Sequence, residues 1–296
     1  MAVYLRSIGF SSLEIEDVLA VRDVVLQKPD RSQTIGMGED KLFAQYYKNT
    51  GQNIGITLTG YLNEKEQLIK PHMMPHVVSD FNLDAYECEV HVIDSDLILT
   101  YEDNNSDNEI AFLMQDRITY EKNPKQFAQL MLDKKIKKKI NVSGISVFGT
   151  IILSVAREED SLEEDEEEMY YNNLVIRSKS GDEQARELLT VYEAKSMQII
   201  RERLKEEDLF SVVDSYFLPV THSDDVSMYD ILGTIEDVEE IINTDTQELV
   251  YKIAVNATGV VMQIFINKDD LLGVPILGMR FMGNCRLQGD VIEIDA

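Results

Sequence analysis

The fold of the C-terminal third is decided by the stretch Leu249-Val-Tyr-Lys-Ile-Ala-Val-Asn-Ala-Thr-Gly-Val-Val-Met-Gln-Ile-Phe-Ile266. Two runs rich in branched and aromatic residues flank Asn256-Ala-Thr-Gly259, and turn residues between such runs are typical of paired strands. Apolar positions alternate along both runs, which favours extended structure over a helix. The stretch therefore predicts two strands joined by a turn.

Further strands are expected on both sides of this stretch. Ile231–Ile242 precedes it, Phe281–Leu287 and Val291–Ile294 follow it, and the short helical turn Asn267–Gly273 lies between the third and fourth strands. Three strands, a short helix and two more strands are the order of an OB-type five-stranded barrel. Residues 209–296 are therefore predicted to form a small C-terminal β-barrel domain with OB-like strand order.

The N-terminal part, residues 1–156, is predicted to be a mixed α/β domain. Ser11 and Glu14 have the spacing of a capping box at the start of a helix over residues 12–27, and Asn123-Pro124 begins a second helix. Strands are expected over residues 53–60, 87–93 and 144–155, whereas residues 108–114 fit a strand or a helix. The pairing order of these strands stays open.

An acidic run separates the two parts. Glu158–Glu168 carries nine carboxylates in eleven positions, and like charges at this density repel one another and resist packing. A solvated linker is the favoured interpretation, and a tail that binds a basic partner is the alternative. A helical hairpin should follow, with helices over residues 169–180, from Asp182, and from Thr190 to about Lys205. The predicted fold is thus α+β, with a mixed domain (1–156), an acidic linker and helical hairpin (157–208) and a barrel (209–296).

Composition excludes several classes of protein. The chain has 296 residues, of which 28 are basic and 54 acidic, for a net charge of −26, and its hydrophobic content of 44% is ordinary for a globular protein. No apolar run reaches the roughly eighteen residues of a membrane span, and the first residues lack a signal-peptide pattern. Cys88 and Cys285 form no disulfide framework. We therefore expect a cytoplasmic protein with reduced thiols and no membrane partner.

The charge distribution also bears on nucleic acid. The last 88 residues hold four basic side chains against fifteen acidic ones, whereas binding to a polyanion depends on Lys and Arg. No nucleic-acid partner is therefore expected, despite the OB-like order. The basic cluster Lys134–Lys139 either contacts an anionic partner or complements the C-terminal end of the helix that begins at Asn123, and the second interpretation is favoured.

The residue types that could support catalysis or metal binding are few. His72 and His76 are the only close histidine pair, with Cys88 and His91 downstream. Pro75 disfavours a helix between the two histidines, and on a strand four residues span roughly 13 Å, too far for one metal ion. A loop could still bring them together. No catalytic, cofactor-binding or metal-ligating residue is assigned, and no cofactor is expected.

A further set of segments comprises Tyr4-Leu-Arg-Ser-Ile-Gly-Phe-Ser11 at the N-terminus and, later in the chain, Asn173–Asp182, Glu207–Pro219, Tyr229–Ile235, Asn267–Gly273, Gly278–Gly283 and Leu287–Gly289. These segments resemble a clostridial (Firmicute) domain-of-unknown-function family. The similarity covers the opening and roughly the last 125 residues. It implies a cytoplasmic protein of an anaerobic Gram-positive bacterium, and it assigns no functional residues because the family has no assigned activity.

Two functional hypotheses follow. The leading one is a non-catalytic binding or protein-interaction protein, because the chain is modular and has no recognisable catalytic motif. The alternative is an enzyme or small-ligand-binding protein with a pocket at the domain junction, where such sites often form. His72, His76, Cys88 and His91 are its first candidates. The oligomeric state and the identity of a partner stay open.

Overall fold

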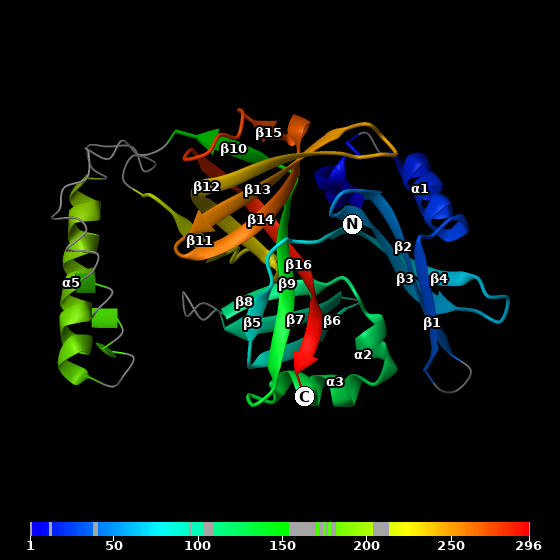
Figure 1. Ribbon diagram of the computed structural model, residues 1–296, viewed down its shortest axis with the longest axis horizontal. Coiled ribbons are helices and arrows are strands. Elements are labelled where there is room, and N and C mark those ends of the chain that lie inside the picture. The colour runs from blue at the N-terminus through cyan, green and yellow to red at the C-terminus, as the bar shows by residue number, and fades with distance from the viewer. Residues whose placement is uncertain are drawn as a thin grey trace. The chain divides into compact units, whose positions relative to one another are not determined.

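The computed structural model describes residues 2–11, 14–37, 41–94, 96–102, 109–153, 170–171, 174–175, 177–178, 182–203 and 213–295. These residues belong to two compact units (Figure 1). The first unit combines residues 1–152 with residues 215–296, and the second covers residues 153–214. Strands dominate the described residues and helices are few, so the fold is α+β.

An antiparallel sheet of four strands, the small sheet, begins the first unit. Its strands follow chain order: β1 (Arg31–Gly36), β2 (Leu42–Gly51), β3 (Ile54–Leu62) and β4 (Leu68–Val77). One face packs on the short helix η1 (Ala2–Ile8) and on α1 (Ile15–Gln27), which lies beside the sheet in Figure 1. The apolar side chains of this interface include Ile54, Ile56, Leu58 and Val77 from the sheet and Leu5, Ile8 and Val25 from the helices.

The large sheet contains the remaining described strands of this unit. They are β5 (Leu83–Ala85), β6 (Cys88–Ile93), β7 (Asp96–Glu102), β8 (Glu109–Met114), β9 (Lys137–Ser146), β10 (Gly149–Ile152), β11 (Tyr216–Pro219), β12 (Met228–Ile242), β13 (Leu249–Ala257), β14 (Val260–Asn267), β15 (Leu271–Leu272) and β16 (Arg280–Asp295). Its main path is β11-β12-β13-β14-β9-β16-β8-β7-β6. The short helices α2 (Ile118–Lys122), α3 (Pro124–Leu132) and η2 (Lys268–Asp270) connect strands.

Five strands of the large sheet pair in a closed circuit. β12, β13 and β14 pair antiparallel in succession, β14 pairs parallel with β9, β9 pairs antiparallel with β16, and β16 pairs antiparallel with β12. The strand that completes the circuit, β9, lies before the acidic run in the sequence. Residues on both sides of 153–214 therefore share one sheet, which differs from the division into domains 1–156, 157–208 and 209–296.

The predicted fifth strand over Val291–Ile294 is wrong as a separate element. β16 runs unbroken from Arg280 to Asp295, and a register shift between Val291 and Glu293 bends it against β9. A β-bulge of this kind re-aims a strand without ending it. Gly289 marks a close approach of two backbones, because a Cβ at this position would lie 2.0 Å from the Asn141 carbonyl oxygen. Gly289 therefore allows the close packing of β16 on β9 and does not form a turn.

The helix predictions are confirmed in part. The Asn123 side chain accepts a hydrogen bond from Gln126 N at the start of α3, as predicted, and α1 begins with a capping box. The capping residue of α1 is Glu14, however, since the Ser11 hydroxyl donates to Glu248 Oε1.

The helical hairpin differs from its prediction. Asp182 caps α5 (Glu183–Arg203), but that helix continues through Thr190, whose hydroxyl donates to the Arg186 carbonyl. The predicted break at Thr190 is therefore wrong. The acidic run Glu158–Glu168 and half of the predicted helix over residues 169–180 lie outside the described residues. None of the described helices is long and apolar enough to cross a membrane.

The lysines of the basic cluster do not close a helix. α3 ends at Leu132, and β9 begins at Lys137, so the favoured interpretation of Lys134–Lys139 is wrong. Lys138 is fully buried, and its ammonium donates to the carbonyls of Tyr86 and Asp133. The other lysines with a described partner pair with acids of this chain: Lys134 with Glu87, Lys137 with Asp84 and Lys139 with Glu293.

Candidate functional site

A cleft of about 700 Å³ opens between the small sheet and the end of β16. Its walls come from β1 to β4, from Val78 after β4, from Asp116 after β8 and from β16. The lining residues are Arg31, Ser32, Gln33, Gln45, Tyr47, Thr57, His76, Val78, Asp116, Asp290, Val291 and Ile292. Clefts of roughly 300–1,000 Å³ with a few convergent polar groups are the usual sites for small ligands.

The register of the small sheet explains why polar side chains converge there. Arg31 pairs with Tyr47, and Tyr47 pairs with Thr57. Cross-strand partners share a face of a sheet, as do residues two apart along a strand. His76 lies two residues after Met74, the partner of Thr57, so it joins the same face. The opposite face carries the apolar residues that pack on α1, which leaves this polar face for the cleft.

Arg31, Tyr47 and His76 form one wall of the cleft. The Arg31 guanidinium carbon lies 4.3 Å from the centre of the Tyr47 ring, and that ring meets the His76 ring edge-on at 4.8 Å. His76 Nδ1 lies 3.0 Å from the Thr57 hydroxyl oxygen. Burial, together with the positive charge of Arg31, lowers the pKa of His76 to about 4. The imidazole is therefore neutral at physiological pH, and Thr57 holds its orientation.

Asp290 and Asp116 form a second, acidic wall of the cleft. Asp290 Oδ1 accepts hydrogen bonds from the backbone N–H groups of Asp116 at 2.6 Å and Gln115 at 3.1 Å. Asp116 Oδ1 accepts from Gln45 Nε2 at 3.2 Å, so the acidic wall is tied to β2. Burial raises the pKa of Asp290 to about 7, and the nearby Asp116 carboxylate adds to this effect, against the lowering influence of the N–H donors. Strongly shifted pKa values in a cleft are a recognised indication of a functional site.

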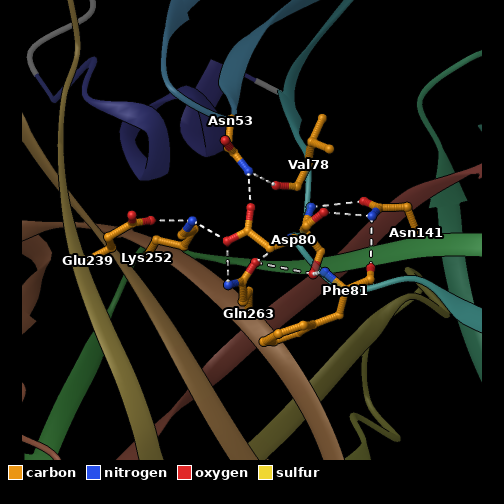
Figure 2. Close-up of polar contacts among 9 residues, drawn as sticks. Asn53, Val78, Asp80, Phe81, Asn141, Glu239, Lys252 and Gln263 are labelled. Carbon is orange, nitrogen blue, oxygen red and sulfur yellow. Dashed lines mark hydrogen bonds and ion pairs between the residues drawn. The ribbon is translucent and has the colours of Figure 1, made fainter.

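A polar network joins the small sheet to the large sheet beside this cleft (Figure 2). Asp80, in the segment after β4, accepts hydrogen bonds from Lys252 at 2.5 Å, Asn53 at 2.8 Å and Gln263 at 3.1 Å. The Lys252 side chain is only 2% exposed and also forms an ion pair with Glu239. These contacts connect the turn before β3 with β12, β13 and β14, and they hold the pKa of Asp80 below its usual value, Lys252 being the main cause.

Asn141 of β9 completes this network. Its side chain accepts from Ser79 N at 2.8 Å and donates to the carbonyls of Ser79 at 2.7 Å and Phe81 at 2.9 Å. Asn53 also donates to the Val78 carbonyl at 2.8 Å. Because Val78 lines the cleft, the network fixes one of its walls (Figure 2).

The four residues suspected from sequence are not brought together. His76 lies in the cleft, and His72 lies on the same strand and is buried beside Asp96, its Nε2 3.5 Å from Asp96 Oδ1. His91 is exposed next to Glu89. Cys88 is buried in the core, and burial raises the pKa of its thiol to about 11, which disfavours the reactive thiolate.

No group of three or more metal-binding side chains occurs among the residues that the structure describes. The version of the enzyme hypothesis that rests on all four suspects is therefore wrong.

A second charged cluster surrounds the buried Arg286. Its guanidinium contacts Asp96 at 3.1 Å and Asp225 at 2.8 Å, and Tyr4 lies beneath it, with the guanidinium carbon 5.0 Å from the ring centre. Asp96 and Asp225 also line a pocket of about 310 Å³ with Asp94 and Asp224. Arg286 already occupies the position of a cation between two of these acids, so we interpret the cluster as structural.

The sequence analysis missed Arg31, Tyr47, Asp116 and Asp290 as site residues. The sequence does contain one indication of this site. Polar and apolar side chains alternate along β2, β3 and β4, and Gln45, Tyr47, Thr57 and His76 occupy the polar face. An alternation with two distinct faces predicts that one face is not core. Asp290 had no such signal, because its place depends on the path of β16.

The polar network predicts unequal effects of removing its two acids. Asp80→Ala should lower the free energy of unfolding by about 2 kcal/mol, because it removes from buried Lys252 an acid that Asn53 and Gln263 also hold in place, while the half-exposed position of Asp80 reduces the loss expected of a fully buried pair. Glu239→Ala should cost about 1 kcal/mol, since Glu239 is also half-exposed and contacts only Lys252 within the network. Urea denaturation followed by circular dichroism measures both values. Equal losses, or a larger loss for Glu239→Ala, would contradict the central place of Asp80.

The cleft also predicts opposing pH effects on stability. Because the pKa of Asp290 is raised from the ordinary 3.8 to about 7 in the folded protein, this group makes the free energy of unfolding fall as pH rises from about 4 to 7. His76 acts in the reverse sense between its ordinary pKa of 6.5 and its folded pKa of about 4, because in that range the unfolded chain binds the extra proton. Its contribution is lost as pH falls.

Single variants separate the two effects. Relative to wild type, Asp290→Asn should gain stability as pH rises from 4 to 8, since an amide oxygen still accepts the N–H groups but carries no charge. Relative to wild type, His76→Asn should gain stability as pH falls from 6.5 to 4. Thermal melts across this range test both slopes. A difference from wild type that does not vary with pH would disprove the assignment for that residue.

Comparison with known proteins places the chain in a family. No curated protein and no solved structure matches the chain. A family model described as "Domain of unknown function, E. rectale Gene description" (DUF3881) matches residues 5–289, and so extends well beyond the segments in which the resemblance was detected. The chain therefore belongs to the DUF3881 family.

Proposed function

We propose that this protein acts by binding a small polar organic molecule in the cleft between the small sheet and β16. The observation that carries the proposal is the convergence of Arg31, His76, Asp116 and Asp290 on one opening of about 700 Å³. Polar side chains on one face of a sheet are costly to cover with protein unless each finds a hydrogen-bond partner. A polar ligand supplies such partners.

Binding without catalysis is favoured by the state of the titratable groups. His76 has a pKa of about 4 and is hydrogen-bonded through Nδ1, which makes it a weak base at neutral pH. The enzyme alternative rests on Asp290, whose pKa of about 7 suits a general base. Oδ1 of this carboxylate is occupied by two N–H donors, an arrangement that favours orientation of a ligand over proton transfer.

The finer features of the fold and location belong to the same proposal. The closed circuit of β12, β13, β14, β9 and β16 supports an OB-type barrel with its last position filled by β9. Two free, buried thiols support a cytoplasmic location. The family description, which refers to E. rectale, supports the bacterial origin that the resemblance implies.

A cleft-filling variant tests the proposed function. Wild-type protein is screened by thermal shift against a library of small polar metabolites, and at least one compound should raise the melting temperature in a concentration-dependent way. Gln33→Trp places a large ring at the exposed edge of the cleft without removing a charged group, and it should abolish that shift. Thr34→Trp, at the next position of β1 and pointing to the other face, is the matched control and should keep the shift.

Failure of every compound, or an equal shift in Gln33→Trp, would overturn the proposed function. The variant is expected to fold, because aromatic residues are favoured in strands and Gln33 is exposed.

Protein interaction is the second candidate function. Five apolar side chains, each more than half exposed, gather where β10 pairs with β15: Phe148, Leu272, Val274, Ile276 and Leu277. Exposed apolar groups of this kind often mark contact surfaces. Leu277→Asp should therefore shift the protein toward lower mass in sedimentation velocity if copies associate through this loop. An unchanged sedimentation coefficient would contradict the proposal that copies associate through this surface.

A further inference from the structure

The cleft presents one cation that lacks a carboxylate partner among the described residues. Arg31 is exposed and stacks on the Tyr47 ring, and no ion pair joins it to an acid of the described chain. Stacking and a side-chain hydrogen bond to Tyr47 orient the guanidinium, whose remaining N–H groups can donate to a ligand. A guanidinium edge matches a carboxylate in a bidentate geometry. This wall therefore suits one anionic group.

The acidic wall presents two acids, Asp290 and Asp116, with oxygens left to accept hydrogen bonds. Asp290 Oδ1 is occupied by backbone N–H groups, whereas Oδ2 has only a long contact of 3.4 Å to Gln115 Nε2. Asp116 Oδ1 is occupied by Gln45 and by Ile118 N. Two carboxyl groups near one another disfavour joint ionisation, and a cation placed between them relieves that repulsion. This wall therefore suits one ammonium group.

The two walls are separated by a distance that a ligand can span. Arg31 and the two acids line the same cleft, yet none of their N and O atoms lie within the 4.0 Å of an ion pair. Gln45, which holds Asp116, lies two residues along β2 from Tyr47, which holds Arg31. Residues two apart on a strand are about 7 Å apart. The two β2 residues that hold the opposite charges of the cleft are therefore about 7 Å apart along the strand.

From this charge pattern we propose that the ligand is a small zwitterion, with a carboxylate bound by Arg31 and a primary ammonium bound by Asp116 and Asp290. This inference rests on the proposed function of the cleft. A dicarboxylate would place an anion against the two acids, and a diamine would place a cation against Arg31, so both are disfavoured. A single arginine balances a monovalent carboxylate better than a dianionic phosphate.

A series of ω-amino acids tests the inference as a molecular ruler. Glycine, β-alanine, 4-aminobutyrate and 6-aminohexanoate are titrated into wild-type protein at pH 8 by calorimetry, together with butyrate and butylamine. One of the two longer probes, 4-aminobutyrate or 6-aminohexanoate, should bind at least tenfold more tightly than butyrate or butylamine. Equal affinity for the zwitterions and the singly charged probes would overturn the inference.

Two variants assign the ends of the zwitterion. Arg31→Met should lower the affinity for the best ω-amino acid at least tenfold and leave that for butylamine unchanged. Asp116→Asn should do the reverse, with a tenfold loss for the ω-amino acid and no change for butyrate. Lys48→Met, on β2 but on the opposite face from Tyr47, is the matched control and should bind like wild type. Equal losses for all probes in either cleft variant would contradict the assignment.

The outcome for this inference can be distinguished from that of the proposed function. If no ω-amino acid binds but a library compound gives a shift that Gln33→Trp abolishes, the zwitterion inference fails and the proposed function stands. If neither the series nor the library yields a ligand sensitive to Gln33→Trp, both fail.

Discussion

The ion pair between Lys252 and Asp80 is the constraint on which the arrangement of the first unit depends. An ammonium that is almost fully removed from water is costly unless a carboxylate and further hydrogen bonds compensate it. Asp80 meets that need only if the segment after β4 crosses the faces of β13 and β14, because Gln263 and Lys252 project from those strands. The same segment carries Val78, so the position of the small sheet, and of the cleft it lines, follows from the burial of one lysine.

The hairpin of β13 and β14 was accessible from sequence because it is local. Alternation along Leu249–Ile266 and the turn at Asn256–Gly259 specify both strands and their partnership. The partner on the far side of β14 was not accessible, because Ile264 pairs with Gly144, more than a hundred residues earlier. Apolar alternation shows that a strand is buried and leaves open which strand covers its edge. The helix start predicted at Thr190 was wrong for a related reason. A threonine that matches a capping pattern can also lie inside a helix, where its hydroxyl donates to a backbone carbonyl one turn earlier.

The site was less predictable than the fold. His76 was among the suspected residues, but only as one of four with His72, Cys88 and His91, which the structure does not bring together. Arg31 and Asp290 could not be predicted as site residues, because the role of each depends on contacts with residues distant in sequence. The Tyr47 ring lies beneath Arg31, and the N–H groups of Gln115 and Asp116 donate to Asp290. The burial of Lys138 could not be predicted for the same reason, since this lysine lies in a basic run of the sequence yet donates to the carbonyls of Tyr86 and Asp133 in the folded protein.

The circuit of strands has a consequence for biosynthesis. β16 pairs with β8, β9, β10 and β12, and it is the last of the described strands to leave the ribosome. Until it emerges, β9 and β12 each have an unpaired edge, and the apolar side chains that they share with β16 stay in water. Long-range pairing of this kind is slow and exposes the nascent chain to aggregation. Folding of the first unit therefore waits until β16 has been made, and the nascent chain would depend on protection of β9 while residues 153–214 are being made.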